Sequence, residues 1–337
     1  MFYIIDDIML PDKTAGSKAR RDINFFLKPE KEVFLFQHDQ KGIAQMEIKS
    51  NQRKVIKEVK EDDVVLIHWP LYLRKPFNGT EWISKVKGFK IAVIHDINSL
   101  RDQESAEVVQ KEVAGLNRFQ VVIVHNKKMK QWLLEHGLTT RMVVLGVFDY
   151  KGETDAIPER TFQKKEKYEV VVAGNLAKEK AGYIYRSEKA DAYCINAYGV
   201  NYEQNDNVNY KGSFEADELP EKLEGDFGLV WDGQSAKECE GNTGNYLRYN
   251  NPHKVSLYIR SNLPIIIWEQ AALASFVKEH EIGFTIRHFD EISEKLSQIT
   301  EEQYNRYLKN LEKLAKETEE GAYIKKAFKE AVSFFQK

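Results

Sequence analysis

Short apolar runs recur along the chain, and they limit its fold more than any other feature. In the first half these runs are "FYIID", "EVFLFQ", "VVLIHWP", "KIAVIHD", "VVIVHNK" and "RMVVLGV". Runs that are apolar on both faces are typical of parallel strands covered by helices. The stretches between them, such as "KKMKQWLLEHGL", have helical spacing. We therefore predict a doubly wound α/β domain over residues 1–150.

A second domain of the same type is predicted after a change in composition. Residues 151–167, "KGETDAIPERTFQKKEK", are polar and charged and read as a linker. Apolar runs resume in residues 168–319 as "YEVVVAGN", "AYCINAYG", "NVNYKG", "FGLVWDG", "LPIIIWE" and "GFTIR". The final segment, 320–337, has apolar residues on one side of a helix, and we expect it to cross back to the first domain. Two such domains facing a cleft would bring their ligand sites together at the carboxyl ends of the strands.

Bulk properties exclude several classes of protein. With 337 residues, 42% hydrophobic and 30% charged, the chain has the composition of a soluble globular protein. Its net charge of −2 provides no global basic field, so we expect no nucleic-acid partner and only local anion recognition. The two cysteines offer no disulfide framework, and no apolar run approaches the ~20 residues of a membrane span. Together with an N-terminus that lacks a basic leader, these features predict a cytoplasmic protein.

The segment "YNNPHKVSLYIRSNLPIIIWE" contains the sharpest local signal. Asn251 is a good N-cap, and Pro252 suits the first helical position. His253 and Lys254 would then lie in the first turn, where the helix dipole disfavours cations unless an anion is bound. We therefore predict an anion site at the start of this helix.

Other residues at predicted strand ends are candidates for the same site. Gly174 and Asn175 end one strand, with Lys178 one turn into the next helix, and Asp232 follows another strand. Tyr210 lies at a further strand end, where a ring could contact a base or a ribose. A solvated helix face explains Lys178 equally well, and a core position explains Tyr210.

The loop after the first strand, "LPDKTAGSKARRD", lacks the Gly-rich fingerprints of dehydrogenases and ATPases, so no nucleotide cofactor is expected. Thr14, Gly16, Ser17 and Lys18 still form a small-residue loop at a predicted helix start, able to approach a ligand closely. An ordinary solvated loop with a helix cap is the alternative.

Three histidines, His68, His95 and His125, close strands of the first domain and point to one end of its sheet. They would fit a zinc site, but no ligand spacing supports one, and we expect no metal. Asp96 follows His95 at the predicted crevice edge and is our first candidate for a proton acceptor, with His95 second. Capping of the next helix is an alternative role for Asp96.

The order of these motifs resembles the donor half of GT-B glycosyltransferases. More closely, "NNPHKVSLYIRSNLPIIIWE", "IHDINSLR", "FGLVWDG" and "TAGSKARRD" are similar to the bacterial β-1,6-galactofuranosyltransferase family. That family resembles in turn the glucosyltransferase that extends N-acetylglucosamine on streptococcal serine-rich-repeat adhesins. The resemblance implies a UDP-sugar donor, transfer without a metal ion, and a surface glycan, glycolipid or glycoprotein as the acceptor. It also implies self-association.

Carried onto this chain, the resemblance makes Lys254 the main cation on the diphosphate, with Lys178 assisting and Tyr210 at an aromatic position of the donor site. The two ribose-binding glutamates of retaining relatives would fall near Tyr249 and Leu257, so that feature is missing. Asn262 replaces the usual turn glycine, because asparagine tolerates left-handed backbone.

Two functions of other classes share this architecture: a two-domain sugar-nucleotide epimerase and a non-catalytic partner subunit of a transferase. Two segments, "RRDINFFLKPEK" and "AYIKKAFKEAVSFFQK", mix basic residues with phenylalanine. They are compatible with peripheral contact with an anionic membrane at its inner face, although core packing explains the phenylalanines more simply.

Overall fold

The computed structural model describes residues 1–8, 15–154, 156–186 and 190–335. The chain divides into two compact units. The first comprises Met1–Asp12, Ile23–Gly146 and Ile324–Lys337, and the second comprises Lys13–Asp22 and Val147–Tyr323. Each unit contains one six-stranded sheet in which every strand pair is parallel. All twelve predicted apolar runs form strands, so the prediction of two doubly wound domains is confirmed.

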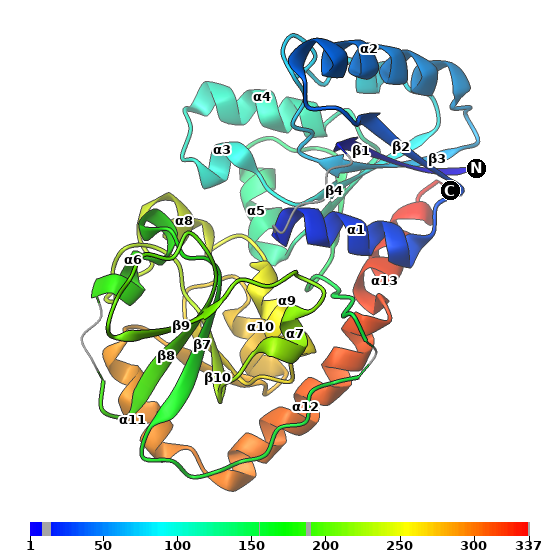
Figure 1. The fold of residues 1–337 in the computed structure, drawn as a ribbon. Coiled ribbons are helices and arrows are strands. Elements are labelled where there is room, and N and C mark those ends of the chain that lie inside the picture. The colour runs from blue at the N-terminus through cyan, green and yellow to red at the C-terminus, as the bar shows by residue number, and fades with distance from the viewer. Residues whose placement is uncertain (9–14, 155, 187–189, 336–337) are drawn as a thin grey trace. The chain divides into compact units, whose positions relative to one another are not determined.

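The first sheet has the strand order β2-β1-β3-β4-β5-β6. Its strands are β1 (Phe2–Ile8), β2 (Lys31–Phe36), β3 (Val64–Trp69), β4 (Phe89–Ile94), β5 (Val121–Val124) and β6 (Arg141–Val144). The helices are α1 (Ala15–Leu27), α2 (Lys41–Glu58), η1 (Glu81–Lys85), α3 (Asn98–Arg101), α4 (Ala106–Leu116), α5 (Lys127–Glu135) and α13 (Ala322–Val332). Helices α2 and α4 lie on one face of this sheet and α1 on the other (Figure 1).

Helix α13 packs on the first unit, as the sequence predicts for the final segment. The ring centroid of Phe328 lies 4.6 Å from that of Phe2 on β1, and Phe335 lies 5.0 Å from Phe89 on β4. The ammonium group of Lys325 lies over the ring of Phe26 on α1. These apolar contacts hold the C-terminal helix against the unit that contains the N-terminal strand.

The second sheet has the strand order β12-β11-β10-β7-β8-β9. Its strands are β7 (Tyr168–Asn175), β8 (Tyr193–Val200), β9 (Val208–Gly212), β10 (Phe227–Val230), β11 (Ile265–Trp268) and β12 (Gly283–Ile286). Its helices are α6 (Lys178–Arg186), α7 (Leu219–Lys222), α8 (Gly241–Tyr246), α9 (His253–Arg260), α10 (Ala274–Glu279), α11 (Asp290–Gln298) and α12 (Glu301–Glu319).

Tyr258 fixes helix α9 against the centre of the second sheet. Its buried hydroxyl accepts a hydrogen bond from Ala173 N at 3.1 Å and lies 3.2 Å from both Val171 O and Leu229 O. Its ring packs on Gly228, where an added Cβ would lie only 2.5 Å from the ring carbons. The contacted residues lie on β7 and β10, so α9 is held over these two central strands. The strands β8 and β9 follow on one side of this pair, and β11 and β12 follow on the other.

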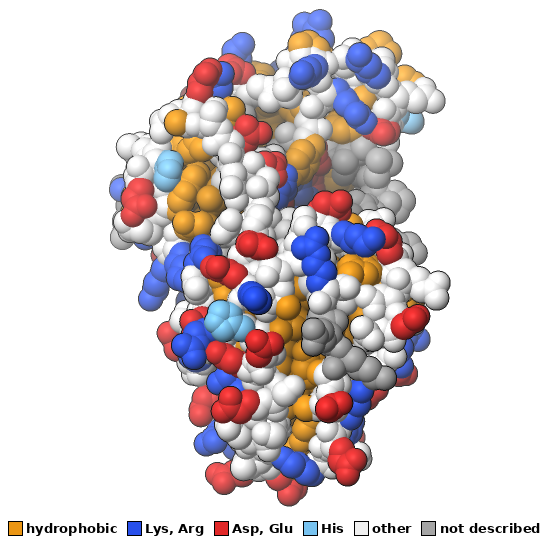
Figure 2. Space-filling view, turned by 90° about the vertical axis from the view of Figure 1, so that its left-hand side faces the viewer, with side chains coloured by type: hydrophobic (Ala, Val, Ile, Leu, Met, Phe, Trp, Pro, Cys, Tyr) orange, Lys and Arg blue, Asp and Glu red, His pale blue; other side chains and the backbone are white. Residues whose placement is uncertain are grey.

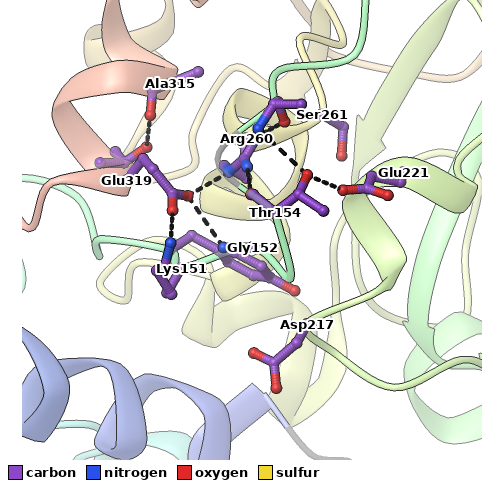
Figure 3. A network of polar contacts seen from close by, with 12 residues as sticks. Lys151, Gly152, Thr154, Asp217, Glu221, Arg260, Ser261, Ala315 and Glu319 are labelled. Atoms are coloured by element: carbon purple, nitrogen blue, oxygen red, sulfur yellow. Dashed lines mark hydrogen bonds and ion pairs between the residues drawn. The ribbon is translucent and has the colours of Figure 1, made fainter.

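The predicted linker is held by a buried ion network (Figure 3). The fully buried guanidinium of Arg260 donates to Glu319 Oε2 at 2.6 Å and to Ala156 O at 2.8 Å. Glu319 also pairs with Lys151 and accepts a hydrogen bond from Gly152 N at 3.1 Å. Buried charges are tolerated when they are paired and hydrogen-bonded, as Arg260 and Glu319 are here. The network therefore anchors the start of the 151–167 segment to the ends of α9 and α12.

The second unit takes in the start of α1, which the sequence analysis placed in the first domain. The reason is Lys18, whose buried ammonium group pairs with Asp217 at 2.8 Å and donates to Lys151 O at 2.6 Å. Both contacts join residues far apart in the sequence.

The face shown in Figure 2 mixes basic and acidic side chains, with apolar groups between them. Such interspersed charge fits the near-zero net charge of the chain. Recognition of an anion must therefore come from particular buried or half-buried cations, not from a broad field.

The close approach of Gly152 to Arg260 leads to a prediction. A Cβ at residue 152 would lie 2.7 Å from Arg260 Nη2. We expect Gly152→Ala to lower the free energy of unfolding by ~1–3 kcal/mol, the usual cost of overpacking, because the guanidinium is held on several sides. The urea midpoint of the wild-type and variant proteins measures this.

Gly42→Ala in α2 is the matched control, since nothing lies within 4 Å of a Cβ at that position. We expect it to leave stability unchanged or to raise it by up to ~1 kcal/mol. Equal urea midpoints for Gly152→Ala and the wild-type protein would contradict this prediction, because they would show that the Arg260 guanidinium can move aside without loss of stability.

Candidate functional site

The carboxyl ends of β7 and β10 form the switch point of the second sheet. The two strands are neighbours, and the chain continues from β7 to β8 and β9 on one side and from β10 to β11 and β12 on the other. The loops that follow them therefore diverge, which in doubly wound sheets creates the ligand crevice. Gly174 and Asn175 end β7, and Trp231 and Asp232 follow β10. The structure thus brings four residues near one sheet edge, three of which belong to the predicted site.

Lys254 lies at this switch point because it is one helical turn before Tyr258 on the same face of α9. Its ammonium group pairs with Asp232 Oδ1 at 2.7 Å and donates to Trp231 O at 3.1 Å. The side chains of Lys254 and Asp232 are only 10% and 7% exposed. An ammonium group has three N–H donors, and these contacts use two of them. Lys254 is therefore a cation held at the end of β10, and its third donor has no hydrogen-bond partner among the described residues.

The start of α9 differs by one residue from the prediction. The helix begins at His253, and Pro252 occupies the N-cap position with φ −65° and ψ 127°. No side chain among the described residues caps this helix. Asn251, predicted as the N-cap, lies one residue before that position and is buried. The helix starts one residue later than predicted because Pro252 has an extended ψ, which is typical of an N-cap residue and not of a helical one.

His253 is a half-buried neutral imidazole in the first turn of α9. Its ring packs between Phe148 and Tyr150, at centroid distances of 5.8 and 5.0 Å. Burial, with a smaller contribution from the positive charge of Lys18, lowers the pKa of His253 to about 3. Its Nε2 atom is shielded from solvent and has no hydrogen-bond partner among the described residues. An unpaired buried polar atom is costly, so this position is suited to a ligand that completes the bond.

The start of α1 contributes a buried cation, Lys18, which the sequence analysis placed in the small-residue loop without foreseeing its burial. Lys18 pairs with Asp22 at 2.5 Å and lies 4.6 Å from the centroid of the Tyr150 ring. Burial raises the pKa of Asp22 to about 6, against the opposing effect of Lys18. Lys18 and Asp22 are four residues apart on one face of the predicted helix, and this spacing could have indicated the ion pair from the sequence.

Of the predicted small-residue loop, Gly16 is exposed and Ser17 is half-buried at the start of α1. Thr14 lies outside the described residues. Gly16 and Ser17 belong to the same compact unit as Lys254.

Lys178 and Tyr210 lie beside β8 and β9 and have other partners. Lys178 is exposed and pairs with Glu203 at 2.5 Å. Tyr210 stacks on Tyr202, with centroids 4.4 Å apart and ring planes at 5°, and its hydroxyl donates to Gly199 O at 2.9 Å. Within the described part of the chain, no hydrogen bond or ion pair joins Lys178 or Tyr210 to Lys254.

Asn175 organises the turn after β7. Its Oδ1 accepts hydrogen bonds from Ala177 N and Asn201 Nδ2, both at 3.0 Å. Gly174 has φ +132°, a conformation that favours glycine, and nothing lies within 4 Å of the Cβ that a larger residue would add. The space in front of Gly174 is therefore open to a ligand.

In the first unit, His95 and Asp96 follow β4 and have different neighbours. Asp96 Oδ2 pairs with Arg101 at 3.1 Å. His95 Nε2 lies 2.7 Å from His68 Nδ1, and His68 Nε2 lies 2.9 Å from Asn24 Oδ1. The structure thus connects His95 to a buried polar chain and Asp96 to a cation.

His125, the third strand-end histidine, has a structural partner. Its Nε2 lies 3.0 Å from Ile94 O, and complete burial lowers its pKa to about 4. Among the described residues, no group of three or more His, Cys, Asp or Glu side chains is arranged to hold a metal ion.

Two buried carboxylates at the end of β1 were not singled out from the sequence. Asp7 Oδ2 accepts a hydrogen bond from Tyr72 N at 2.7 Å, and Asp6 Oδ1 accepts one from Asp7 N at 2.8 Å. Two adjacent acidic residues at the end of an apolar run were the signal. Separately, none of the described helices combines the length and the apolar character that crossing a bilayer requires.

Comparison with known proteins places both halves of the chain in one family. Residues 2–147 match the family described as "Glucosyltransferase 3-like, N-terminal domain", and residues 170–331 match the corresponding C-terminal domain. The β-1,6-galactofuranosyltransferase WbbI of Escherichia coli strain K12 is 31% identical over 98% of each chain. Glucosyltransferase 3 of Streptococcus gordonii is 24% identical over 89% of this chain and 88% of its own.

Solved structures extend the likeness to the fold. Anabaena HepE, determined in complex with UDP, is 12% identical and has a TM-score of 0.63, covering 98% of this chain and 99% of its own. At this identity the likeness shows the fold alone, which is that of GT-B glycosyltransferases. Taken with the relatives above, these matches show that the chain belongs to the glucosyltransferase 3-like family of GT-B glycosyltransferases.

Proposed function

We propose that this glycosyltransferase moves galactofuranose or glucose from a UDP-sugar to a hydroxyl group of a cell-surface glycan, glycolipid or glycoprotein, without a metal ion. The single observation that carries the proposal is Lys254, held by Asp232 at the switch point of the second sheet. The names of the relatives support the choice of sugars, and the UDP bound to HepE supports the choice of nucleotide.

The diphosphate would bind between Lys254 and the first turn of α9. The remaining N–H of Lys254 and the Nε2 of His253, if protonated there, would each donate to a phosphate oxygen. Backbone N–H groups and the helix dipole add to the attraction. Because negative charge grows on the diphosphate as the glycosidic bond breaks, these donors would stabilise the transition state more than the ground state.

Lys178, Tyr210 and Asn175 would take secondary parts in the proposal. The open space at Gly174 and the neighbouring Asn175 would border the sugar or the nucleotide. Tyr210 would offer its exposed ring to the base, and Lys178 would assist only after leaving Glu203.

The acceptor hydroxyl would lose its proton to the His95–Asp96 pair of the first unit. Asp96 was the first candidate from the sequence, but Arg101 holds its carboxylate. His95 has an imidazole as its partner, so the geometry favours His95.

The epimerase and partner-subunit alternatives are not favoured by relatives that are named as transferases. A thermal-shift screen with UDP-, GDP- and dTDP-sugars tests the donor class. Stabilisation by UDP-sugars supports the proposal, and free sugar released as the product of donor alone would favour an epimerase.

The ion pair of Lys254 leads to the first functional prediction. Lys254→Ala should weaken UDP-sugar binding and slow transfer together, with a loss of ~2–4 kcal/mol in transition-state stabilisation. It should also lower stability, because it leaves the buried carboxylate of Asp232 without its cation. Titration calorimetry with UDP and steady-state kinetics measure the two functional effects.

Two comparisons separate binding from folding. The double variant Lys254→Ala/Asp232→Asn removes the stranded charge, so it should recover stability without recovering UDP affinity. Lys278→Ala removes an exposed lysine of α10 in the same unit and should behave as the wild-type protein. Wild-type affinity and kinetics in Lys254→Ala would place the diphosphate elsewhere.

Metal independence is a second prediction. No Asp-x-Asp occurs in the sequence to hold an ion on the diphosphate, and Lys254 with the α9 N-terminus can supply that charge instead. Initial rates of transfer should be the same with and without EDTA. A rate that falls on chelation and returns with Mn²⁺ or Mg²⁺ would refute this part of the proposal.

Self-association and peripheral contact with an anionic membrane from the cytoplasmic side complete the proposal. Phe25 on α1 and Phe335 after α13 are 54% and 37% exposed, more than core packing requires. We expect co-sedimentation with phosphatidylglycerol vesicles but not with phosphatidylcholine vesicles, and a weaker effect in Phe25→Ser. Equal recovery in the supernatant with both lipids would exclude the membrane contact.

A further inference from the structure

Four polar side chains form a chain of contacts within the first unit. Glu32 on β2 lies at one end, followed by Asn24 on α1, His68 on β3 and His95 after β4. The contacts are 3.5 Å from Asn24 Nδ2 to Glu32 Oε2, 2.9 Å from Asn24 Oδ1 to His68 Nε2, and 2.7 Å from His68 Nδ1 to His95 Nε2. Asn24 and His68 are buried, and His95 is half-buried.

Glu32 determines which way the Asn24 amide faces. A carboxylate accepts hydrogen bonds and cannot donate them, so it attracts the Nδ2 group of Asn24 and repels Oδ1. Turning the amide over would place two acceptor oxygens against each other. Asn24 therefore presents Oδ1, an acceptor, to His68.

The amide in turn determines the protons on both histidines. His68 Nε2 must carry a hydrogen in order to donate to Asn24 Oδ1. Since His68 is fully buried and neutral imidazole carries one N–H, its Nδ1 is the acceptor. His95 must then donate from Nε2, which leaves the lone pair of neutral His95 on Nδ1.

We infer that Asn24 and His68 are positioning residues that hold His95 as its Nε2–H tautomer and so make His95 Nδ1 the proton acceptor for the attacking hydroxyl. The inference rests on the proposed transferase function and assigns an atom within it. Protonation of Nδ1 keeps the Nε2–H bond to His68 intact, so the chain persists through the reaction. A second proton on His68 would instead face the N–H of His95.

The proton and electron pairs balance in this step. The hydroxyl oxygen of the acceptor forms a bond to the anomeric carbon of the donor sugar, and its proton moves to His95 Nδ1. The bond from that carbon to the diphosphate oxygen breaks, and its electron pair leaves on the diphosphate. Because Nδ1 is shielded from solvent, a hydroxyl can reach it only after nearby groups move, a change that acceptor binding must drive.

The tautomers can be measured without any activity. In the wild-type protein labelled with ¹⁵N-histidine, two-bond proton–nitrogen spectra distinguish a protonated from an unprotonated ring nitrogen. We expect Nε2–H for both His68 and His95, with assignments from His68→Gln and His95→Gln. A proton on Nδ1 of neutral His68 would overturn the inference, even in a fully active enzyme.

The positioning role is tested by Asn24→Leu, a change of similar size. We expect His68 and His95 to lose their single tautomer, and kcat to fall at least ~10-fold, within the range for a misplaced proton acceptor, while KM for the donor changes less than ~3-fold. Asn51→Leu is the matched control, since Asn51 donates to Phe34 O and Leu35 O of the same unit and has no hydrogen bond to either histidine among the described residues. It should preserve both tautomers and kcat.

The outcomes separate the two claims. The expected tautomers together with no transfer from any UDP-sugar would refute the proposed function. Transfer with wild-type kcat in Asn24→Leu, despite lost tautomers, would refute the inference and leave the function standing.

Discussion

Parallel pairing in both sheets is the constraint on which the candidate sites depend. When all strands of a sheet run the same way, their carboxyl ends share one edge, and residues far apart in the sequence become neighbours there. In the second unit this brings the end of β10 to the start of α9, where Asp232 meets Lys254. In the first unit it brings the ends of β3 and β4 together, where His68 meets His95. Both sites therefore depend on the order and direction of the strands more than on any local sequence motif.

The two sites use buried charge in different ways. At α9 the structure keeps a full positive charge, Lys254, and balances it with one carboxylate. A diphosphate bound as we propose would meet a cation that is already desolvated. His253 beside it stays neutral because burial lowers its pKa to about 3. In the first unit the polar chain has the carboxylate of Glu32 at one end and is otherwise a series of hydrogen bonds between Asn24, His68 and His95. Anion binding and proton transfer have these different needs.

The strands could be predicted from the sequence because buried parallel strands have a simple signature, and all twelve predicted runs form strands. The crossing of the last helix followed from its apolar side. Asn262 at φ +51° confirms that asparagine fills the left-handed turn before β11. These features depend on local periodicity and backbone preference, which a single sequence records.

The remaining features depend on contacts between distant segments. Lys18 joins the second unit through Asp217, almost two hundred residues away in the chain, and nothing in "TAGSKARRD" indicates that partner. The Asn24–His68 contact crosses from α1 to β3 for the same reason. The start of α9 was misplaced by one residue because the fixed φ of proline, −65° at Pro252, is compatible both with the N-cap position observed and with the first helical position predicted.

A crystal structure of the chain with UDP would test the central claim most directly. The account predicts a phosphate oxygen within hydrogen-bond distance of Lys254 Nζ and close to the backbone N–H groups of the first turn of α9. A diphosphate bound beside Lys178 and Tyr210 at the β8–β9 side of the sheet, with the Lys254–Asp232 pair untouched, would contradict it.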